Sequence, residues 1–274
     1  MTIRRIDSHA HVFCANNKYP FAADREYTPH PTQLGTPERF AAVLDAHGFT
    51  HGLLVSAGPY GSDNRCMLEA IAGHGGRFKG IALVNADVSD RELQALVDGG
   101  VVGVRMNIMN HGLRPLTEPG ADRLLAKVKA LNWFVQIHSQ KNELIEAGPL
   151  LRKAGVRVMF DHFGRPDLRQ DAKGRGYQAL LQFGREGNHV IKLSGPFRSS
   201  LEGPPYRDTD PFIHAAIDAF TLERCVWGSD WPWVRMDERM DYGPVYACLD
   251  RWLPDANDRQ KVLWDTPAGL FGFK

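Results

Sequence analysis

Two histidines near the start of the chain, in Ile6-Asp7-Ser8-His9-Ala10-His11, are the first residues whose types and spacing could do chemistry. The run is typical of a short extended strand, in which residues i and i+2 point to the same side, so both imidazoles can reach one small volume. Imidazole pairs hold divalent metals or polarise a substrate oxygen. Such a pair can equally be structural, so its meaning depends on what other strands bring to the same place.

Further chemistry-bearing residues stand where later apolar runs end. His138 closes the run Phe-Val-Gln-Ile-His, His162 follows Val-Met-Phe-Asp, and Asp230 ends Val-Trp-Gly-Ser-Asp. Each has a plainer interpretation, because a core histidine can bond a carbonyl and an aspartate can cap a helix. Four histidines and an aspartate at four such ends nevertheless favour one shared pocket, which the plainer interpretations do not predict.

Apolar runs alternate with amphipathic stretches along the chain. The runs lie at 6–11, 52–56, 80–84, 101–106, 134–137, 156–160, 190–193 and 225–227, and the helical stretches at 36–48, after 63, and at 89–98, 120–131, 143–154, 176–187, 210–220 and 242–274. Strands that are apolar throughout and separated by helices indicate a parallel sheet covered on both sides. Eight strands predict an α/β fold with a single (β/α)8 TIM barrel over residues 1–274, and an active site at the C-terminal ends of the strands.

Composition narrows the class of protein. The 274 residues, 43% of them hydrophobic, suit a barrel of roughly 250 residues. A net charge of +1 gives no electrostatic case for nucleic acid or a membrane, and we find neither a signal-peptide core nor an apolar run of about 18 residues. Four cysteines without CxxC spacing are typical of reduced thiols. We expect a cytoplasmic protein acting on a small molecule, and a homo-oligomer is compatible with the sequence.

A polar segment at 14–35 has neither strand nor helix periodicity, and segments of this length in compact proteins are usually functional or disordered. Its aromatic and arginine content favours an ordered lid and makes Tyr27 a candidate substrate contact. His111 and Arg235, in the loops after the fourth and eighth runs, are further candidates.

Several stretches in order from residue 6 to 232 resemble the amidohydrolase superfamily, and within it the branch of 2-pyrone-4,6-dicarboxylate lactonase and related lactone hydrolases. They include Ile-Asp-Ser-His-Ala-His-Val-Phe, Gly-Val-Arg-Met-Asn, Asp-His-Phe-Gly-Arg-Pro, Lys-Leu-Ser-Gly-Pro-Phe-Arg and Gly-Ser-Asp-Trp-Pro. The resemblance implies a hydrolase in which Asp230 is the general base that takes a proton from the attacking water. It assigns polarisation of the carbonyl oxygen to His9, His11 and His162.

Three arginines just beyond predicted strands, Arg105, Arg165 and Arg198, then fit as clamps for substrate carboxylates. A guanidinium binds a carboxylate through two parallel hydrogen bonds, so the set suggests an anionic lactone as substrate. One or two of the three could instead pair with a local acid such as Asp161 or Asp167. We expect at least two to face the pocket.

Two loops differ from what the resemblance leads us to expect. Asn107, Asn110 and His111 stand where a further arginine is expected, and Trp233 and Arg235 follow Asp230 where an asparagine is expected. The positive charges are rearranged, so we predict a related lactone, such as a muconolactone or a sugar lactone, rather than the pyrone dicarboxylate itself.

The end of the fifth strand bears on metal binding, because His138 stands where the lactonase pattern has a tyrosine. His9, His11, His138 and Asp230 would complete a mononuclear site suited to Zn²⁺ or Mn²⁺. The fourth strand ends in neither lysine nor glutamate, so a bridged binuclear site is not expected. The hypotheses are a metal-free lactone hydrolase in which His138 contacts substrate, a hydrolase with one metal, or a metal-dependent decarboxylase of an aromatic or enol acid. A non-catalytic small-acid binding protein fits poorly with so many titratable groups at strand ends.

Overall fold

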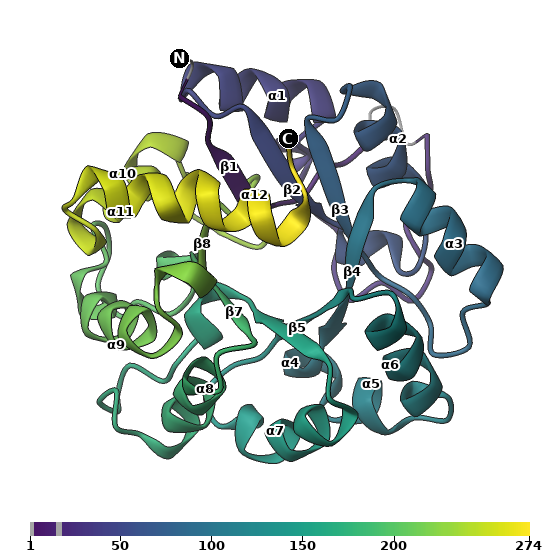
Figure 1. Cartoon of the computed structure of the whole chain (residues 1–274). Helices are drawn as coiled ribbons and strands as arrows, with labels where there is room; N and C mark the ends of the chain where they lie inside the picture. Colours follow the sequence, from purple (N-terminus) through teal and green to yellow (C-terminus); the bar gives the residue numbers. More distant parts are fainter. Residues whose placement is uncertain (1–2, 15–17) are drawn as a thin grey trace.

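Eight parallel strands follow one another around a barrel in the computed structural model, which describes residues 3–14 and 18–274 (Figure 1). The strands are β1 Ile6–Ala10, β2 His51–Val55, β3 Phe78–Ala82, β4 Val101–Asn107, β5 Phe134–His138, β6 Arg157–Phe160, β7 Val190–Ser194 and β8 Cys225–Gly228. Each strand pairs in parallel with the next one in the chain. The predicted (β/α)8 barrel is confirmed, with strand ends displaced by a residue or two; that residues 1–274 form one domain stays a prediction.

The seam between β1 and β8 brings the first and last parts of the chain together. Beyond the regular strands, the backbone N–H of Asp230 donates to the carbonyl of His9 at 2.8 Å, and that of His11 to the carbonyl of Trp231 at 2.7 Å. Gly228 faces β1 so closely that a Cβ there would lie 2.6 Å from the Cβ of His9, which requires glycine. Closure of the barrel therefore places both histidines beside the aspartate.

Helices cover the outside of the barrel as a ring (Figure 1). The ring is α1 Pro37–Ala46, α2 Arg65–Gly73, α3 Asp90–Asp98, α6 Ala121–Ala130, α7 Glu143–Ala154, α8 Arg175–Arg185, α9 Asp210–Phe220 and α10 Tyr242–Trp252, and the C-terminal segment adds α11 Ala256–Gln260 and α12 Thr266–Phe271. Two short helices that the sequence pattern did not predict, α4 Ile108–His111 and α5 Arg114–Thr117, follow β4. None of the helices described is both long enough and apolar enough to cross a bilayer.

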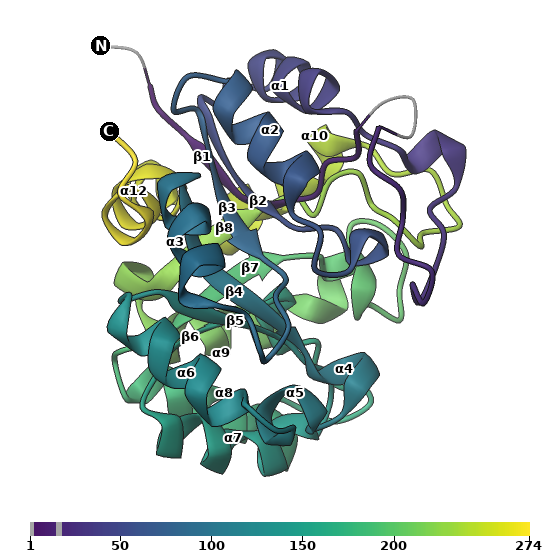
Figure 2. The same ribbon diagram turned by 90° about the vertical axis from the view of Figure 1, so that its right-hand side faces the viewer.

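The two ends of the barrel differ in the polarity of the side chains that fill them. At one end, Phe271 and Phe273 pack against the inner strand residues Ile6, Leu53 and Phe134. Figure 2 shows α12 at this end and α4, which follows the carboxyl end of β4, at the other. The amino end is therefore plugged with apolar side chains, and polar chemistry is left to the carboxyl end.

The predicted loop at 14–35 contains one short 3-10 turn, Pro31–Gln33, while residues 15–17 lie outside the described part of the chain. The Gln33 amide donates to the carbonyl of Met236 at 2.7 Å, and the N–H of Ala22 donates to the carbonyl of Pro59 at 2.8 Å. These bonds tie the loop to the segments that follow β8 and β2. Its role as a lid stays a prediction.

Candidate active site

A cavity of about 500 Å³ opens at the carboxyl end of the barrel. Most of the residues singled out in the sequence line it, namely His11, Tyr27, Arg105, His138, His162, Arg165, Arg198, Asp230 and Arg235. His9 lies fully buried directly against this set. His111 instead lines an adjoining hollow, where its Nε2 lies 2.8 Å from Glu26. A role for His111 in substrate binding stays a prediction.

Asp230 sits among three imidazoles. Its Oδ1 lies 3.6 Å from Nε2 of His9 and 3.6 Å from Nε2 of His11, and its Oδ2 lies 3.8 Å from Nε2 of His162. Arg198 donates from Nε to Oδ2 at 2.6 Å. All three imidazoles and the carboxylate are buried. The tertiary structure thus brings together the four residues that the sequence nominated for catalysis.

Burial and charge together set the protonation of this cluster. Burial by itself would raise the pKa of Asp230, but the charge of Arg198 and the nearby imidazoles hold that pKa well below its usual range. Burial, helped by the charge of Lys192, lowers the pKa of His9 well below its ordinary value, and burial lowers that of His162 to about 3. At neutral pH the cluster therefore holds an ionised Asp230 beside the neutral imidazoles of His9 and His162.

Backbone conformation also marks this region. Asp230 (φ 61°), His162 (φ 49°), Arg165 (φ 46°) and Arg235 (φ 63°) all lie in the left-handed region. Residues with a side chain are rare there, and each costs on the order of 1–3 kcal/mol, so such residues gather where function demands a particular orientation. A Cβ at Gly195 would lie 2.7 Å from Nδ1 of His162, so a glycine is needed beside this histidine.

A second layer of buried polar residues lies beneath the imidazoles. Asp161 accepts from Nε of Arg105 at 3.0 Å and from Nε2 of Gln136 at 3.1 Å. Lys192 donates to Oε1 of Gln136 at 2.7 Å and lies 3.2 Å from Nδ1 of His9. Burial by itself would raise the pKa of Asp161, but His9, Arg105 and Lys192 hold it well below its usual range. Burial lowers the pKa of Lys192 to about 8, which leaves it charged at neutral pH.

Sequence reasoning missed Lys192 and Gln136. A signal was present, since each is a polar residue inside an otherwise apolar run, Val-Ile-Lys-Leu-Ser and Phe-Val-Gln-Ile-His. In a strand buried on both faces, such a residue must find partners inside the barrel.

The four pocket arginines divide into two pairs. Arg105 and Arg198 are bound to Asp161 and Asp230. Arg165 and Arg235 have no carboxylate partner among the residues that the structure describes.

Arg165 donates from Nη1 to Nε2 of His138 at 3.4 Å, while its buried Nε has no hydrogen-bond partner within the described chain. The Arg235 guanidinium lies 5.4 Å from the ring centroid of Tyr27. Nη1 of Arg165 also contacts Sδ of Met109 at 3.1 Å, and its Nη2 donates to the carbonyl of Arg198 at 3.3 Å. Neither guanidinium group is neutralised by a carboxylate of the described chain.

By spacing, three residues fit one divalent ion. His9, His11 and Asp230 each offer a ligand atom, and these atoms lie within 4.8 Å of one another. An ion held by them would polarise a carbonyl and lower the pKa of bound water. His138 is outside this group, with its Nε2 3.4 Å from Nη1 of Arg165, and its part in a metal site stays a prediction.

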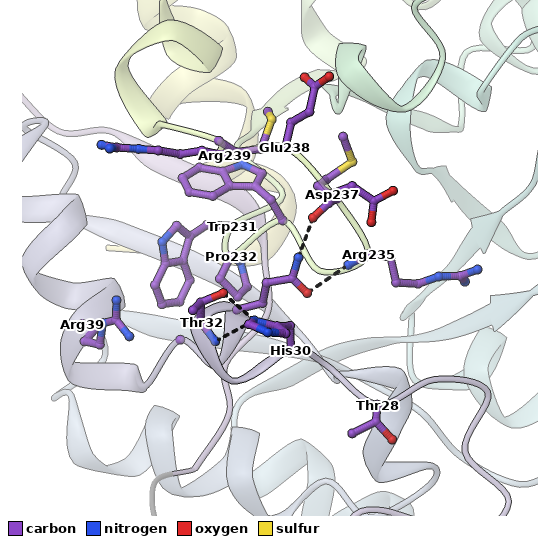
Figure 3. Close-up of a pocket in the computed structure, with 15 residues that line it drawn as sticks. Thr28, His30, Thr32, Arg39, Trp231, Pro232, Arg235, Asp237, Glu238 and Arg239 are labelled. Atoms are coloured by element: carbon purple, nitrogen blue, oxygen red, sulfur yellow. Dashed lines mark hydrogen bonds between the residues drawn. The ribbon is translucent and has the colours of Figure 1, made fainter.

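A separate hollow of about 750 Å³ lies beside the mouth of the cavity, between residues 28–39 and 231–240 (Figure 3). Arg235 lines both spaces. The Gln33 side chain joins its two walls, because it donates to the carbonyl of Met236 at 2.7 Å and accepts from the N–H of Arg235 at 3.3 Å. The loop that contains Gln33 thereby holds the segment that carries Arg235.

The sequence profile of the amidohydrolases (Amidohydro_2) matches residues 6–273. The chain belongs to this family. It is 33% identical to a 2-pyrone-4,6-dicarboxylate hydrolase of Comamonas testosteroni, over 97% of this chain and 89% of that protein. It is 31% identical to a 4-sulfomuconolactone hydrolase of Rhizobium radiobacter, over 97% and 89% of the two chains. A crystal structure of a probable 2-pyrone-4,6-dicarboxylic acid hydrolase of Acinetobacter baumannii, with citric acid bound, superposes with a TM-score of 0.87 at 32% identity and covers 100% of both chains. This amidohydrolase is therefore similar to lactone hydrolases along its whole barrel.

Proposed function

We propose that this amidohydrolase opens a carboxylated lactone with water. The observation that carries the proposal is the Asp230 carboxylate among three imidazoles, in a cavity that also holds Arg165 and Arg235, two guanidinium groups without a carboxylate partner in the described chain. The similar proteins from Comamonas testosteroni and Rhizobium radiobacter are named for anionic lactones, and the Acinetobacter baumannii structure holds a tricarboxylic acid. Both the cluster and the relatives support hydrolysis of an anionic substrate.

In this mechanism Asp230 takes a proton from water while the water oxygen bonds to the lactone carbonyl carbon. Negative charge builds on the carbonyl oxygen, where N–H groups of His9 and His162 donate to it. The bond from the carbonyl carbon to the ring oxygen then breaks, and the ring oxygen receives the proton from Asp230. Donors fixed at an oxyanion contribute several kcal/mol, and a placed general base roughly 10²–10⁴-fold in rate.

His11 has a different place in this scheme from the one that the resemblance implied. Its Nδ1 lies 2.9 Å from the carbonyl of Val55, and since a carbonyl only accepts, Nδ1 carries the proton. In the neutral ring Nε2 then has a lone pair, which faces Asp230. His11 is thus suited to accept the second hydrogen of the attacking water and to orient it.

Arg165 and Arg235 bind the substrate carboxylates. A bound substrate carboxylate also makes Asp230 a stronger base, because negative charge brought into the cavity raises the pKa of a neighbouring carboxylate. The base is therefore weak while the cavity is empty and stronger when an anionic substrate fills it.

We propose that the reaction needs no metal. Three buried or half-buried cations, Arg105, Arg198 and Lys192, already face two carboxylates, Asp161 and Asp230. Arg165 adds a fourth positive charge beside His138. A divalent ion between His9, His11 and Asp230 would add charge to an already cationic site, and like charges at short range repel strongly.

The test is hydrolysis of a panel of lactones by purified protein, before and after exhaustive chelation. The panel contains 2-pyrone-4,6-dicarboxylate, muconolactones with a carboxylate, and an uncharged sugar lactone as the matched control. We expect turnover of a carboxylated lactone, weak or no turnover of the uncharged one, and no effect of chelation. Failure on every carboxylated lactone would refute the proposal, and release of CO₂ from an aromatic acid that depends on Zn²⁺ or Mn²⁺ would replace it with the decarboxylase.

A further inference from the structure

Lys192 is a buried charge that the proposed mechanism does not use. It lies in the middle of β7 with none of its surface exposed. Its Nζ lies 2.7 Å from Oε1 of Gln136, 3.2 Å from Nδ1 of His9 and 3.6 Å from Oδ1 of Asp161. Burying an ammonium away from water is costly unless its contacts compensate. The contacts of Lys192 with its neighbours therefore show what this charge does.

Two groups compete for Nδ1 of His9. Oδ1 of Asp161 lies 3.2 Å away and would accept a proton from it, while Lys192 can only donate to it. The lysine contact has hydrogen-bond geometry. The contact of Oδ1 of Asp161 with His9, in contrast, lacks good hydrogen-bond geometry, and the bonds from Arg105 and Gln136 go to the other oxygen of this carboxylate.

With Lys192 donating, Nδ1 of His9 holds the lone pair. A neutral imidazole carries one proton, which must then lie on Nε2, the buried atom that faces Asp230 and has no other partner in the described chain. His11 has the opposite arrangement, because the carbonyl of Val55 draws its proton to Nδ1. The two histidines of the His-Ala-His stretch thus present different groups to the cavity, an N–H from His9 and a lone pair from His11.

We infer that Lys192 is a positioning residue that holds His9 in the Nε2–H tautomer, so that His9 offers a donor to the reacting carbonyl oxygen. The purpose of that donor rests on the proposed lactone hydrolysis; the tautomer itself does not.

Removal of the ammonium has a defined result. Asp161 is then left to accept from Nδ1 of His9, as carboxylates do behind histidines that bind metal. Nε2 of His9 gains a lone pair and joins Nε2 of His11 and Oδ1 of Asp230, the three atoms already spaced for a divalent ion. The presence of Lys192 therefore decides whether Nε2 of His9 is a hydrogen-bond donor or a metal ligand.

The deciding experiment is a two-bond ¹⁵N–¹H correlation spectrum of protein labelled at histidine, recorded for wild type, Lys192→Met and Lys79→Met. Lys79, in β3, is a barrel-strand lysine that lies over the ring of Phe273 at the opposite end, so it is the matched control. We expect His9 protonated on Nε2 in wild type and Lys79→Met, and on Nδ1 in Lys192→Met. A wild-type His9 protonated on Nδ1, or a Lys192→Met spectrum like wild type, would overturn the inference. Should Lys192→Met not fold, the wild-type spectrum alone decides.

Zinc titration followed by calorimetry gives an independent readout. We expect Lys192→Met to bind Zn²⁺ about 10–100-fold more tightly than wild type, the range that a carboxylate behind a histidine contributes. On a lactone that wild type turns over, kcat should fall about 10²–10³-fold with little change in KM, since the lost donor acts on the developing oxyanion. Unchanged zinc affinity, or a loss confined to KM, would contradict the inference. Spectrum and titration need no substrate, so a failed lactone panel would refute the proposed function and leave this result standing.

Discussion

Replacement of Asp230 by asparagine tests the centre of the proposed reaction. The variant keeps the shape of the side chain and removes its charge and its ability to take a proton. A positioned general base contributes roughly 10²–10⁴-fold, which corresponds to about 2.7–5.5 kcal/mol in activation free energy. We expect kcat to fall by this factor with a smaller change in KM.

The same change must not unfold the protein, and the structure indicates that it will not. Arg198 loses its counter-charge, but the amide oxygen of asparagine can still accept from its Nε. Both Nη atoms of Arg198 remain bound to the carbonyl of Val234 at 3.2 Å. With one charged hydrogen bond replaced by a neutral one, the free energy of unfolding should fall by roughly 1–3 kcal/mol, not the 3–5 kcal/mol typical of a buried charge left unpaired.

The assay follows lactone loss at several substrate concentrations for wild type, Asp230→Asn and Asp167→Asn, together with thermal unfolding of each. Asp167 also follows β6 at the carboxyl end, but it is absent from the cavity lining, so it controls for the loss of one acid. A folded Asp230→Asn with kcat within tenfold of wild type would show that another group is the base.

Three further outcomes are expected. Arg165→Gln should raise KM for carboxylated lactones about 10–100-fold, the value of one charged hydrogen bond, and should change KM little for an uncharged lactone. Because the pKa values of His9, His162 and Asp230 are all lowered, these three groups should keep their charge between pH 7 and pH 5, and the imidazole signals of His9 and His162 in an NMR titration should not shift over this range; a titration of either histidine near pH 6.5 would contradict the lowered pKa values. Burial raises the pKa of Asp7 to about 6, so the native state binds this proton more tightly than the unfolded chain, and the stability it contributes is lost as pH rises from about 4 to 6. The free energy of unfolding of Asp7→Asn relative to wild type, measured with denaturant, should therefore increase by up to about 3 kcal/mol between pH 4 and pH 8. An unchanged difference between the two proteins would contradict the raised pKa.

The architecture could be read from the chain because its signals are local. Each strand is a short apolar run and each covering helix an amphipathic stretch, and eight repeats of this alternation leave few alternatives to a closed barrel. The same reasoning placed His9, His138, His162 and Asp230 at strand ends, and the carboxyl ends of parallel strands meet at one face. The short helices α4 and α5 were not predicted, because four residues are too few to show a helical period.

Pairing among the charged residues could not be read in this way. From the sequence, Arg105, Arg165 and Arg198 are three equivalent arginines, but in the barrel Arg105 binds Asp161, Arg198 binds Asp230 and Arg165 keeps a free Nε. His138 and His9 were equivalent candidates as metal ligands, and only the barrel shows that Nε2 of His138 lies beside Arg165. These distinctions depend on distances of a few ångströms between residues that are dozens of positions apart in the chain.

The sequence by itself determined the barrel, the face that carries the chemistry and most of the residue types found there, because strand and helix periodicity and the ends of parallel strands depend on near neighbours. Only the tertiary structure decided which arginines lack a carboxylate partner, which histidines share Asp230, and which groups lie beside the ring nitrogens of His9 and His11. The physical reason is that hydrogen bonds and pKa values inside a barrel depend on close contacts across it, here between β1, β5, β6, β7 and β8, which closure of the sheet alone creates.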